Sequence, residues 1–317
     1  MPEREEPLTK KITILVALIV ALFLCLSCSK HREEDGAGRL RIVTTLFPLY
    51  DFTRAVAGEK AEVYLLLPPG VESHSFEPKP DDIIRINKSD LFIFTNRAME
   101  PWAGDIISGL DSKKILVVDA SRGIAFRHVQ PGRGHGHDHG NGADPHIWLD
   151  FGNAATMVDN ILAGLVAGDP ENRSHYTANA TAYKARLKDL DRSYREGLSA
   201  CEKKLILHGG HFAFGYLADR YGLKYESAYA LSADAEPTPA RIAALIRQMR
   251  SNGLRHIFTE ELMEPRVARI IAQETGAGIL KLHGGHNIGK DELRSGVTFL
   301  SLMDRNLQNL RTGLQCR

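Results

Sequence analysis

Residues 171–200 read ENRSHYTANATAYKARLKDLDRSYREGLSA, with no proline and a single glycine, Gly197. Apolar side chains recur along this stretch at helical spacing, at Tyr176, Tyr183, Leu187, Leu190, Tyr194 and Leu198. At a rise of about 1.5 Å per residue, such a stretch makes a rod of roughly 45 Å. The pattern therefore predicts one long helix, which we place at residues 169–201.

On either side of this helix, short apolar strands alternate with amphipathic helices. The predicted strands are Arg39–Thr45, Ala61–Pro68, Asp90–Thr95, Lys114–Asp119, Lys204–His208, Leu223–Tyr229, His256–Thr259 and Gly278–Leu282. Predicted helices are Tyr50–Ala57, Pro80–Asn87, Pro101–Gly109, one that begins at Thr238-Pro239 and ends at Gly253, and Asp291–Arg311. This alternation is typical of parallel sheets covered by helices. We therefore expect an α/β protein with two lobes, residues 39–168 and 202–317.

The long helix would join the two lobes and resist hinge bending between them. A coiled-coil stalk of a dimer is the alternative. We favour the connector because heptads are not sustained in residues 171–200 and two complete lobes need a link.

Composition agrees with a two-domain globular protein and excludes several classes. The chain has 317 residues, 40 Lys and Arg against 39 Asp and Glu, and 43% hydrophobic residues. Such a balance argues against disorder and against a protein with many membrane spans. No excess of positive charge is present to drive nucleic-acid binding, so we set that class aside.

The N-terminus has the pattern of an export signal. Lys10 and Lys11 precede an apolar run, Ile12–Leu26, that is short for a bilayer-spanning helix. Cys28 directly after this run indicates a bacterial lipobox, in which the thiol is lipidated and residues 1–27 are removed. Cys25 departs from that pattern, and an uncleaved anchor is the alternative. In either case most of the chain lies outside the cytoplasm, with residues 28–38 as a polar tether.

Cys201 and Cys316 also lie in the exported part of the chain. That compartment is oxidising, so the two thiols could pair. The sequence does not show that they are close enough, and we expect no disulfide between them.

Histidines follow predicted strands in four separate loops, two in each lobe. They are His74 in PPGVESHSFEP, His146 in DPHIWLD, His211 in HGGHFAF, and His283 with His286 in LHGGH. Each one alone would more often be an ordinary loop or core histidine. Together they are hard to explain by packing, because strand-end loops at one sheet edge form the cleft of such folds. Four imidazoles suit a tetrahedral Zn²⁺ site between the lobes.

Residues 127–143 form a glycine-rich segment, RHVQPGRGHGHDHGNGA, with histidines at 128, 135, 137 and 139. Such tracts bind metal weakly and reversibly. A purification tag or a neutral low-complexity loop is the alternative. The segment is internal and directly precedes DPHIWLD, so we favour a loop in which His128, His135, His137 and His139 collect metal.

Several motifs in order resemble a known family, the extracytoplasmic lipoproteins that deliver Zn²⁺ or Mn²⁺ to ABC importers. They are RIVTTLFPLYDFTRAVAG, LLLPPGVESHSFEPKPDD, DPHIWLD, HFAFGYLADRYGL and IFTEELMEPRVARIIAQETGA. The histidine-rich insert and the long central helix also match. The resemblance implies an ABC permease and its ATPase as partners, a lipid anchor in the membrane on the periplasmic or cell-surface side, and a monomer.

The same resemblance places the family's metal ligands on His74, His146 and His211. The fourth ligand of the family is usually an Asp after the last strand, and here His283 holds that place, with His286 or a water as the alternative. Glu260 matches a glutamate that supports the site. Because imidazole nitrogens suit zinc and carboxylate oxygens suit manganese, we predict Zn²⁺ as the ligand and regard Mn²⁺ as the less favoured metal.

Three functions are compatible with such a site. The first is a zinc-binding protein that serves an importer and is not an enzyme. The second is a zinc hydrolase with Glu77 or Glu260 as general base, although the chain has no His-Glu-x-x-His motif and a fourth imidazole would close the coordination sphere. The third is a zinc-dependent surface adhesin, which exposed apolar patches would favour.

Overall fold

A computed structural model describes residues 39–129, 142–231, 236–262 and 264–317. The apolar run Ile12–Leu26, the lipidation site Cys28, and His135, His137 and His139 lie outside the described residues, so these predictions stay open. Within the described ranges no helix is both long and apolar enough to cross a membrane.

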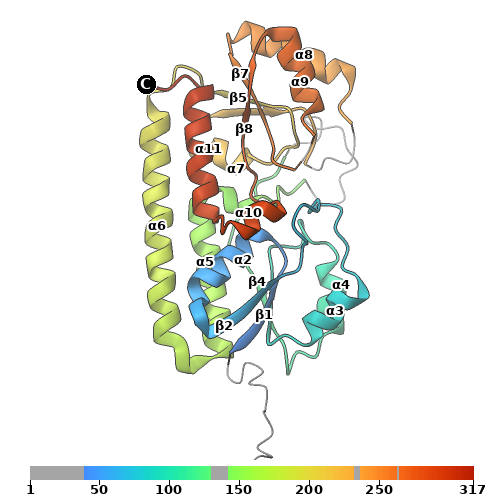
Figure 1. Cartoon of the computed structure of the whole chain (residues 1–317), viewed down its shortest axis with the longest axis vertical. Helices are drawn as coiled ribbons and strands as arrows, with labels where there is room; N and C mark the ends of the chain where they lie inside the picture. The colour runs from blue at the N-terminus through green and yellow to red at the C-terminus, as the bar shows by residue number, and fades with distance from the viewer. Residues whose placement is uncertain (1–38, 130–141, 232–235, 263) are drawn as a thin grey trace, which may run out of the picture. The chain divides into compact units, whose positions relative to one another are not determined.

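Two four-stranded parallel sheets form the framework (Figure 1), and all eight predicted strands are present. The first sheet has the order β2-β1-β3-β4 and the second the order β6-β5-β7-β8, so both follow one connection pattern. The strands are β1 Leu40–Thr44, β2 Ala61–Leu65, β3 Leu91–Phe94, β4 Leu116–Asp119, β5 Leu205–His208, β6 Lys224–Ser227, β7 His256–Thr259 and β8 Gly278–Lys281. The α/β prediction is confirmed.

Helices cover both faces of the first sheet because its strands are apolar on both sides. Ile42 faces a core with α2 (Phe47–Ala57) and α5 (Phe151–Gly168), and its neighbour Val43 faces a core with α3 (Pro80–Asn87) and α4 (Ala103–Gly109). Successive side chains of a strand point to opposite faces, so a sheet buried on both sides needs apolar residues throughout. β3, with the sequence LFIF, is buried at all four positions.

The second sheet is covered in the same way. Leu207 and Ile257 pack on α8 (Pro239–Ser251) and α9 (Arg266–Thr275), whereas Ile206 and Phe258 face the core that contains α11 (Phe299–Gly313). A short helix, α7 (Gly215–Arg220), follows β5. The start of α8 agrees with the prediction, since the Thr238 side chain accepts a hydrogen bond from the Arg241 N–H at the first turn.

The predicted long helix is α6, Arg173–Ser199, preceded by a 3₁₀ turn at Pro170–Asn172. Its predicted apolar stripe is buried, and the helix packs against α5 and α2 of the first lobe and α11 of the second (Figure 1). One continuous core therefore contacts α6 along both lobes. A stripe that is buried within its own chain cannot also form the seam of a coiled-coil stalk.

The predicted single helix Asp291–Arg311 is wrong, because the chain forms two helices there. α10 covers Lys290–Arg294 and α11 begins at Phe299. Gly296 between them has φ 71°, a left-handed conformation that glycine tolerates. Thr298 then starts α11 by accepting a hydrogen bond from the Ser301 N–H at 3.2 Å.

The prediction that Cys201 and Cys316 do not pair is also wrong. The two residues form a disulfide across 115 positions of sequence. Cys201 follows the end of α6 and Cys316 follows the end of α11, and these helices pack together and end at the same place. The sequence could not show this proximity because it depends on the packing of α11 beside α6.

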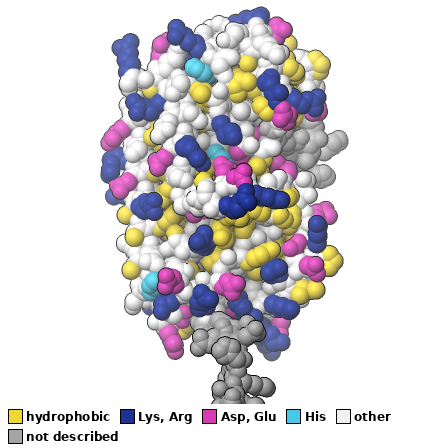
Figure 2. All heavy atoms as spheres, viewed as in Figure 1, with side chains coloured by type: hydrophobic (Ala, Val, Ile, Leu, Met, Phe, Trp, Pro, Cys, Tyr) yellow, Lys and Arg dark blue, Asp and Glu magenta, His cyan; other side chains and the backbone are white. Residues whose placement is uncertain are grey.

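Charged side chains of both signs are interspersed over the face of the molecule shown in Figure 2. This mixing agrees with the formal net charge of +1. Exposed large apolar side chains occur on separate elements, for example Tyr64 on β2, Ile84 on α3 and Ile270 on α9.

Candidate metal centre

Histidines from both lobes reach the site from loops beyond the carboxyl ends of the strands. His74 lies in the irregular segment after β2, and His146 lies between the histidine-rich insert and a 3₁₀ turn at Ile147–Leu149. His211 follows β5 and His286 follows β8. This placement is the one expected for ligands of open parallel sheets.

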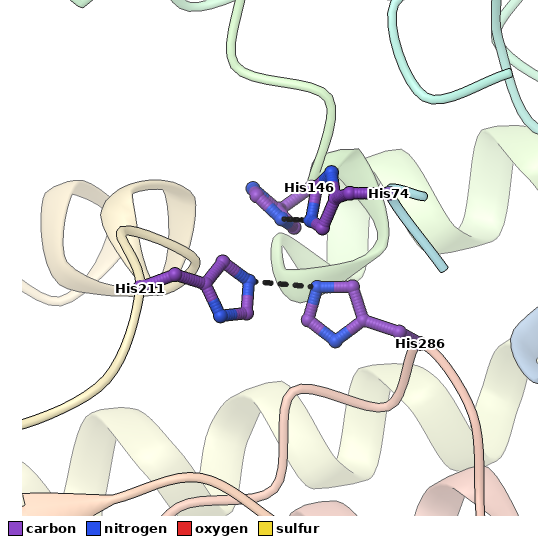
Figure 3. Close-up of side chains that lie close together, drawn as sticks. All are labelled: His74, His146, His211 and His286. Carbon is purple, nitrogen blue, oxygen red and sulfur yellow. Dashed lines mark hydrogen bonds between the residues drawn. The ribbon is translucent and has the colours of Figure 1, made fainter. Parts of the chain in front are cut away.

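These four imidazoles converge on one place (Figure 3). Each offers a ring nitrogen, and the four nitrogens lie within 4.8 Å of one another. The Nε2 atoms of His146 and His74 are 3.3 Å apart, as are those of His211 and His286. A tetrahedral zinc ion with bonds of about 2.0–2.1 Å needs nitrogens about 3.3–3.4 Å apart. The spacing of these pairs therefore suits zinc.

The cluster is shielded from water, and this burial favours neutral rings at His74 and His146. His146, His211 and His286 are buried, and His74 is partly exposed. Burial, followed by repulsion from the neighbouring histidines, lowers the pKa of His74 and of His146 well below the usual range. Neutral imidazole is the form that binds a metal ion.

Carboxyl groups on the outer side of the cluster orient the rings. Asp144 Oδ1 lies 2.8 Å from Nδ1 of His146, and Glu260 is hydrogen-bonded to Nδ1 of His211. A carboxylate that accepts from Nδ1 leaves the lone pair of Nε2 directed into the cluster. Two acidic residues, Asp144 and Asp150, lie near His146 in the sequence. Only Asp144 contacts the His146 ring, whereas Asp150 caps the start of α5.

Electrostatics differ between these two pairs. Burial alone would lower the pKa of His211, but the Glu260 carboxylate outweighs it and raises this pKa to about 9. Burial raises the pKa of Asp144 to about 7, although the His146 N–H and Arg127 oppose the shift. The Glu260–His211 pair is therefore an ion pair at neutral pH, whereas the His146 ring beside Asp144 is neutral.

The fourth member of the cluster is His286, whereas we expected His283. His283 Nδ1 lies 3.3 Å from Glu261 and its Nε2 lies 3.7 Å from Glu292. Among the described residues, His283 is not part of the group whose nitrogens converge. The two histidines are separated by two glycines, and the fold of that turn decides which ring enters the cluster.

Sequence reasoning missed Glu261, which directly follows the predicted Glu260. The side chain of Glu261 is 6% exposed and lies 3.7 Å from Nδ1 of His286. Burial would raise the pKa of Glu261, but the neighbouring imidazoles of His283 and His286 outweigh it and lower this pKa. The tandem Glu260-Glu261 after β7 could have signalled that each carboxylate supports a different histidine.

Other predicted residues lie outside the cluster. Glu77 is exposed, so it does not occupy the position of a general base beside the four rings. His128 pairs with Ala143 at the two ends of the histidine-rich insert, and Val129 donates to the Gly142 carbonyl at 2.8 Å. The insert therefore leaves and rejoins the fold just before His146, and its role in collecting metal stays a prediction.

The model of a protein family described as "Zinc-uptake complex component A periplasmic" (ZnuA) matches residues 42–313. The chain belongs to this family. ZnuA of Bacillus subtilis, named a high-affinity zinc uptake system protein, is 34% identical over 310 residues, which cover 95% of this chain and 96% of that protein.

The zinc-binding lipoprotein AdcA of Streptococcus pneumoniae strain R6 is 35% identical over 307 residues, or 95% of this chain. This chain spans 60% of the length of AdcA. The crystal structure of the Zn(II)-bound ZnuA-like domain of Streptococcus pneumoniae AdcA has a TM-score of 0.75 and 34% identity, and the match covers 87% of this chain and 99% of that domain.

Proposed function

We propose that this protein captures Zn²⁺ outside the cytoplasm with His74, His146, His211 and His286, and delivers it to an ABC import permease and its ATPase. The convergence of four imidazole nitrogens within 4.8 Å, two from each lobe, carries this proposal. Membership of the zinc-uptake family and the names of the relatives support it.

Zinc fits the cluster better than manganese. All four candidate ligand atoms are imidazole nitrogens, and three of the rings are buried. Nitrogen-rich sites suit zinc, whereas manganese prefers carboxylate oxygen and water. Ion binding by residues of both lobes would also fix their relative orientation and stabilise the folded state by mass action.

Transport suits this cluster better than hydrolysis. Catalytic zinc sites keep an open position for water, but four imidazoles complete a tetrahedral sphere. A zinc hydrolase is therefore the weaker alternative. A surface adhesin could use the same fold and the same ion, and that alternative stays a prediction.

The export pattern at residues 1–27 and the thiol of Cys28 support a lipid anchor at the outer side of a membrane. Such an anchor would keep the protein near its permease. The histidine-rich insert would raise the local concentration of zinc beside His146.

Calorimetric titration of the metal-free protein tests the proposal. We expect one Zn²⁺ per chain, tighter binding than for Mn²⁺, and a melting temperature that rises with zinc. The variant His286→Ala should lose tight binding, whereas His256→Gln, altered at the amino end of β7, should bind as the natural protein does. Preference for Mn²⁺, or a melting temperature that zinc does not change, would contradict the proposal.

Cell growth separates transport from adhesion. Deletion of the gene should slow growth in the presence of a zinc chelator, and added zinc should restore it. Normal growth under chelation together with lost adhesion would instead favour the adhesin alternative.

A further inference from the structure

His283 is buried, although it lies outside the cluster of converging rings. It opens the turn His283-Gly284-Gly285-His286 after β8. Asn306 of α11 holds its backbone on both sides: the His283 N–H donates to Asn306 Oδ1 at 2.7 Å, and Asn306 Nδ2 donates to the His283 carbonyl at 2.8 Å. The start of the turn is therefore fixed to a helix.

The His283 ring closes the turn on itself. The Gly285 N–H donates to His283 Nδ1 at 3.0 Å, and Gly285 has φ 76°. Nδ1 also lies 3.3 Å from Glu261, but the Gly285 N–H points at it from the shorter distance of 3.0 Å. We therefore assign Nδ1 as the acceptor and place the ring hydrogen on Nε2, which faces Glu292 at 3.7 Å. The lone pair of Nδ1 is thus used within the turn.

The rest of the turn is also held at each residue. The Gly284 N–H donates to Glu261 at 2.8 Å, and the Gly284 carbonyl accepts from the indole N–H of Trp148 at 2.8 Å. The His286 carbonyl accepts from the Phe47 N–H at 3.1 Å. A Cβ at Gly284 would overlap the His286 ring, so the turn is shaped closely around that ring.

We propose that His283 is a positioning residue: by accepting the Gly285 N–H, its imidazole shapes the turn that brings His286 to the metal. This inference rests on the proposed zinc-binding function and deepens it. A histidine that follows the last strand thus acts on the site through its neighbour and does not coordinate the ion itself.

Two amide substitutions test this role. In His283→Asn, the side-chain oxygen takes the place of Nδ1 and can still accept the Gly285 N–H. In His283→Gln, the longer side chain places its oxygen near the position of Nε2, so the Gly285 N–H loses its acceptor. The two variants bury similar polar groups, and melting of the metal-free proteins checks that both fold.

Zinc affinity and the absorption spectrum of the Co²⁺ complex are measured for both variants, the natural protein and His286→Ala. We expect His283→Asn to stay within a few-fold of the natural protein. His283→Gln should bind zinc about 10–100-fold more weakly, as is typical when an outer partner of a ligand is lost, and its Co²⁺ spectrum should shift toward that of His286→Ala. The double variant His283→Gln with His286→Ala should bind zinc no more weakly than His286→Ala alone, because His283 acts only through His286.

The outcomes separate this inference from the proposed function. Failure of the natural protein to bind zinc overturns the proposed function. Tight binding by the natural protein together with unchanged binding by His283→Gln overturns the positioning role. Equal losses in the Asn and Gln variants, with His286→Ala unaffected, would make His283 itself the ligand and also overturn the inference.

Discussion

At the scale of single residues, carboxyl groups decide which nitrogen of His146 and of His211 faces the cluster. Asp144 and Glu260 contact the Nδ1 atoms of His146 and His211. An imidazole held in this way needs no rotation before it binds a metal ion, although His211, whose pKa is raised to about 9, must first release the proton on Nε2. The candidate zinc site is therefore organised largely by residues that do not themselves bind the ion.

Glu260 provides a direct test of this organisation. The backbone N–H of His211 donates to Glu260 Oε1 at 3.1 Å, and the amide oxygen in Glu260→Gln can still accept this hydrogen bond. The substitution removes the negative charge beside the His211 ring. We expect zinc affinity to fall about 10–100-fold in a competition titration. Glu77→Gln, at an exposed position, is the matched control. Equal affinities in the two variants would refute the role of Glu260.

Glu100 predicts a dependence of stability on pH that is separate from the histidines. This buried carboxyl accepts hydrogen bonds from the N–H groups of Thr95 and Asn96, and burial raises its pKa to about 7 from the usual 4.5. The folded state thus holds a proton that the unfolded state releases. The stability that this proton contributes is complete below about pH 4.5 and is lost as the pH rises through 7.

The variant Glu100→Gln is neutral at every pH and removes this loss. The free energy of unfolding of the variant minus that of the natural protein should therefore increase by up to about 3 kcal/mol from pH 5 to pH 8. Urea denaturation at the two pH values measures the difference, and other titrating groups cancel between the proteins. A difference that is constant with pH would show that Glu100 does not titrate in this way.

The sequence predicted three of the four converging histidines because each follows a parallel strand, β2 or β4 in the first sheet and β5 in the second, and ligands bind at the carboxyl ends of such strands. The fourth was predicted wrongly as His283 instead of His286, because both follow β8 and only the path of the two glycines between them separates the two. Contacts between distant residues, such as Trp148 with Gly284, were equally invisible in the sequence.

At the scale of elements, the strands were the most predictable part because buried parallel strands are short continuous apolar runs. Our sequence prediction contained no helix at α5, although α5 contacts the first sheet, α2 and α6. A helix buried on several sides lacks a clear polar face, so its periodicity is weak. Glycines such as Gly164 weaken the helical signal further. The structure needs glycine there, because a Cβ at position 164 would overlap the side chain of Val118.

The two faces of α6 should respond differently to substitution. Leu187 is 1% exposed in the shared core, so Leu187→Ala should lower the free energy of unfolding by about 2–5 kcal/mol. Lys188→Ala, one residue further on the exposed side, should change it by less than about 0.5 kcal/mol. Chemical denaturation measures both. Similar small effects would mean that α6 is not held by this core.

At the scale of the whole molecule, one core contacts α6 along both lobes. Wide separation of the lobes would expose this core to water, and the cost grows with the apolar area exposed. We therefore expect small rotations on zinc binding. If the proposed transport function holds, release of zinc at the permease would require the docked permease to force the lobes apart.

The disulfide joins the ends of α6 and α11 and should stabilise the whole fold. It spans 115 positions, and removal of a native disulfide typically costs about 2–5 kcal/mol. The double variant Cys201→Ser with Cys316→Ser should show this loss in urea denaturation. Adding reductant should lower the free energy of unfolding of the natural protein but leave that of the variant unchanged. Equal stabilities would contradict a structural role for the bond.

The central claim is that four imidazoles from the two lobes coordinate one zinc ion. X-ray absorption at the zinc edge, combined with a crystal structure of the one-to-one complex, tests it most directly. We predict four nitrogens at about 2.0–2.1 Å, from His74, His146, His211 and His286. An ion bound by His283, by carboxylate oxygens, or away from these rings would contradict the account.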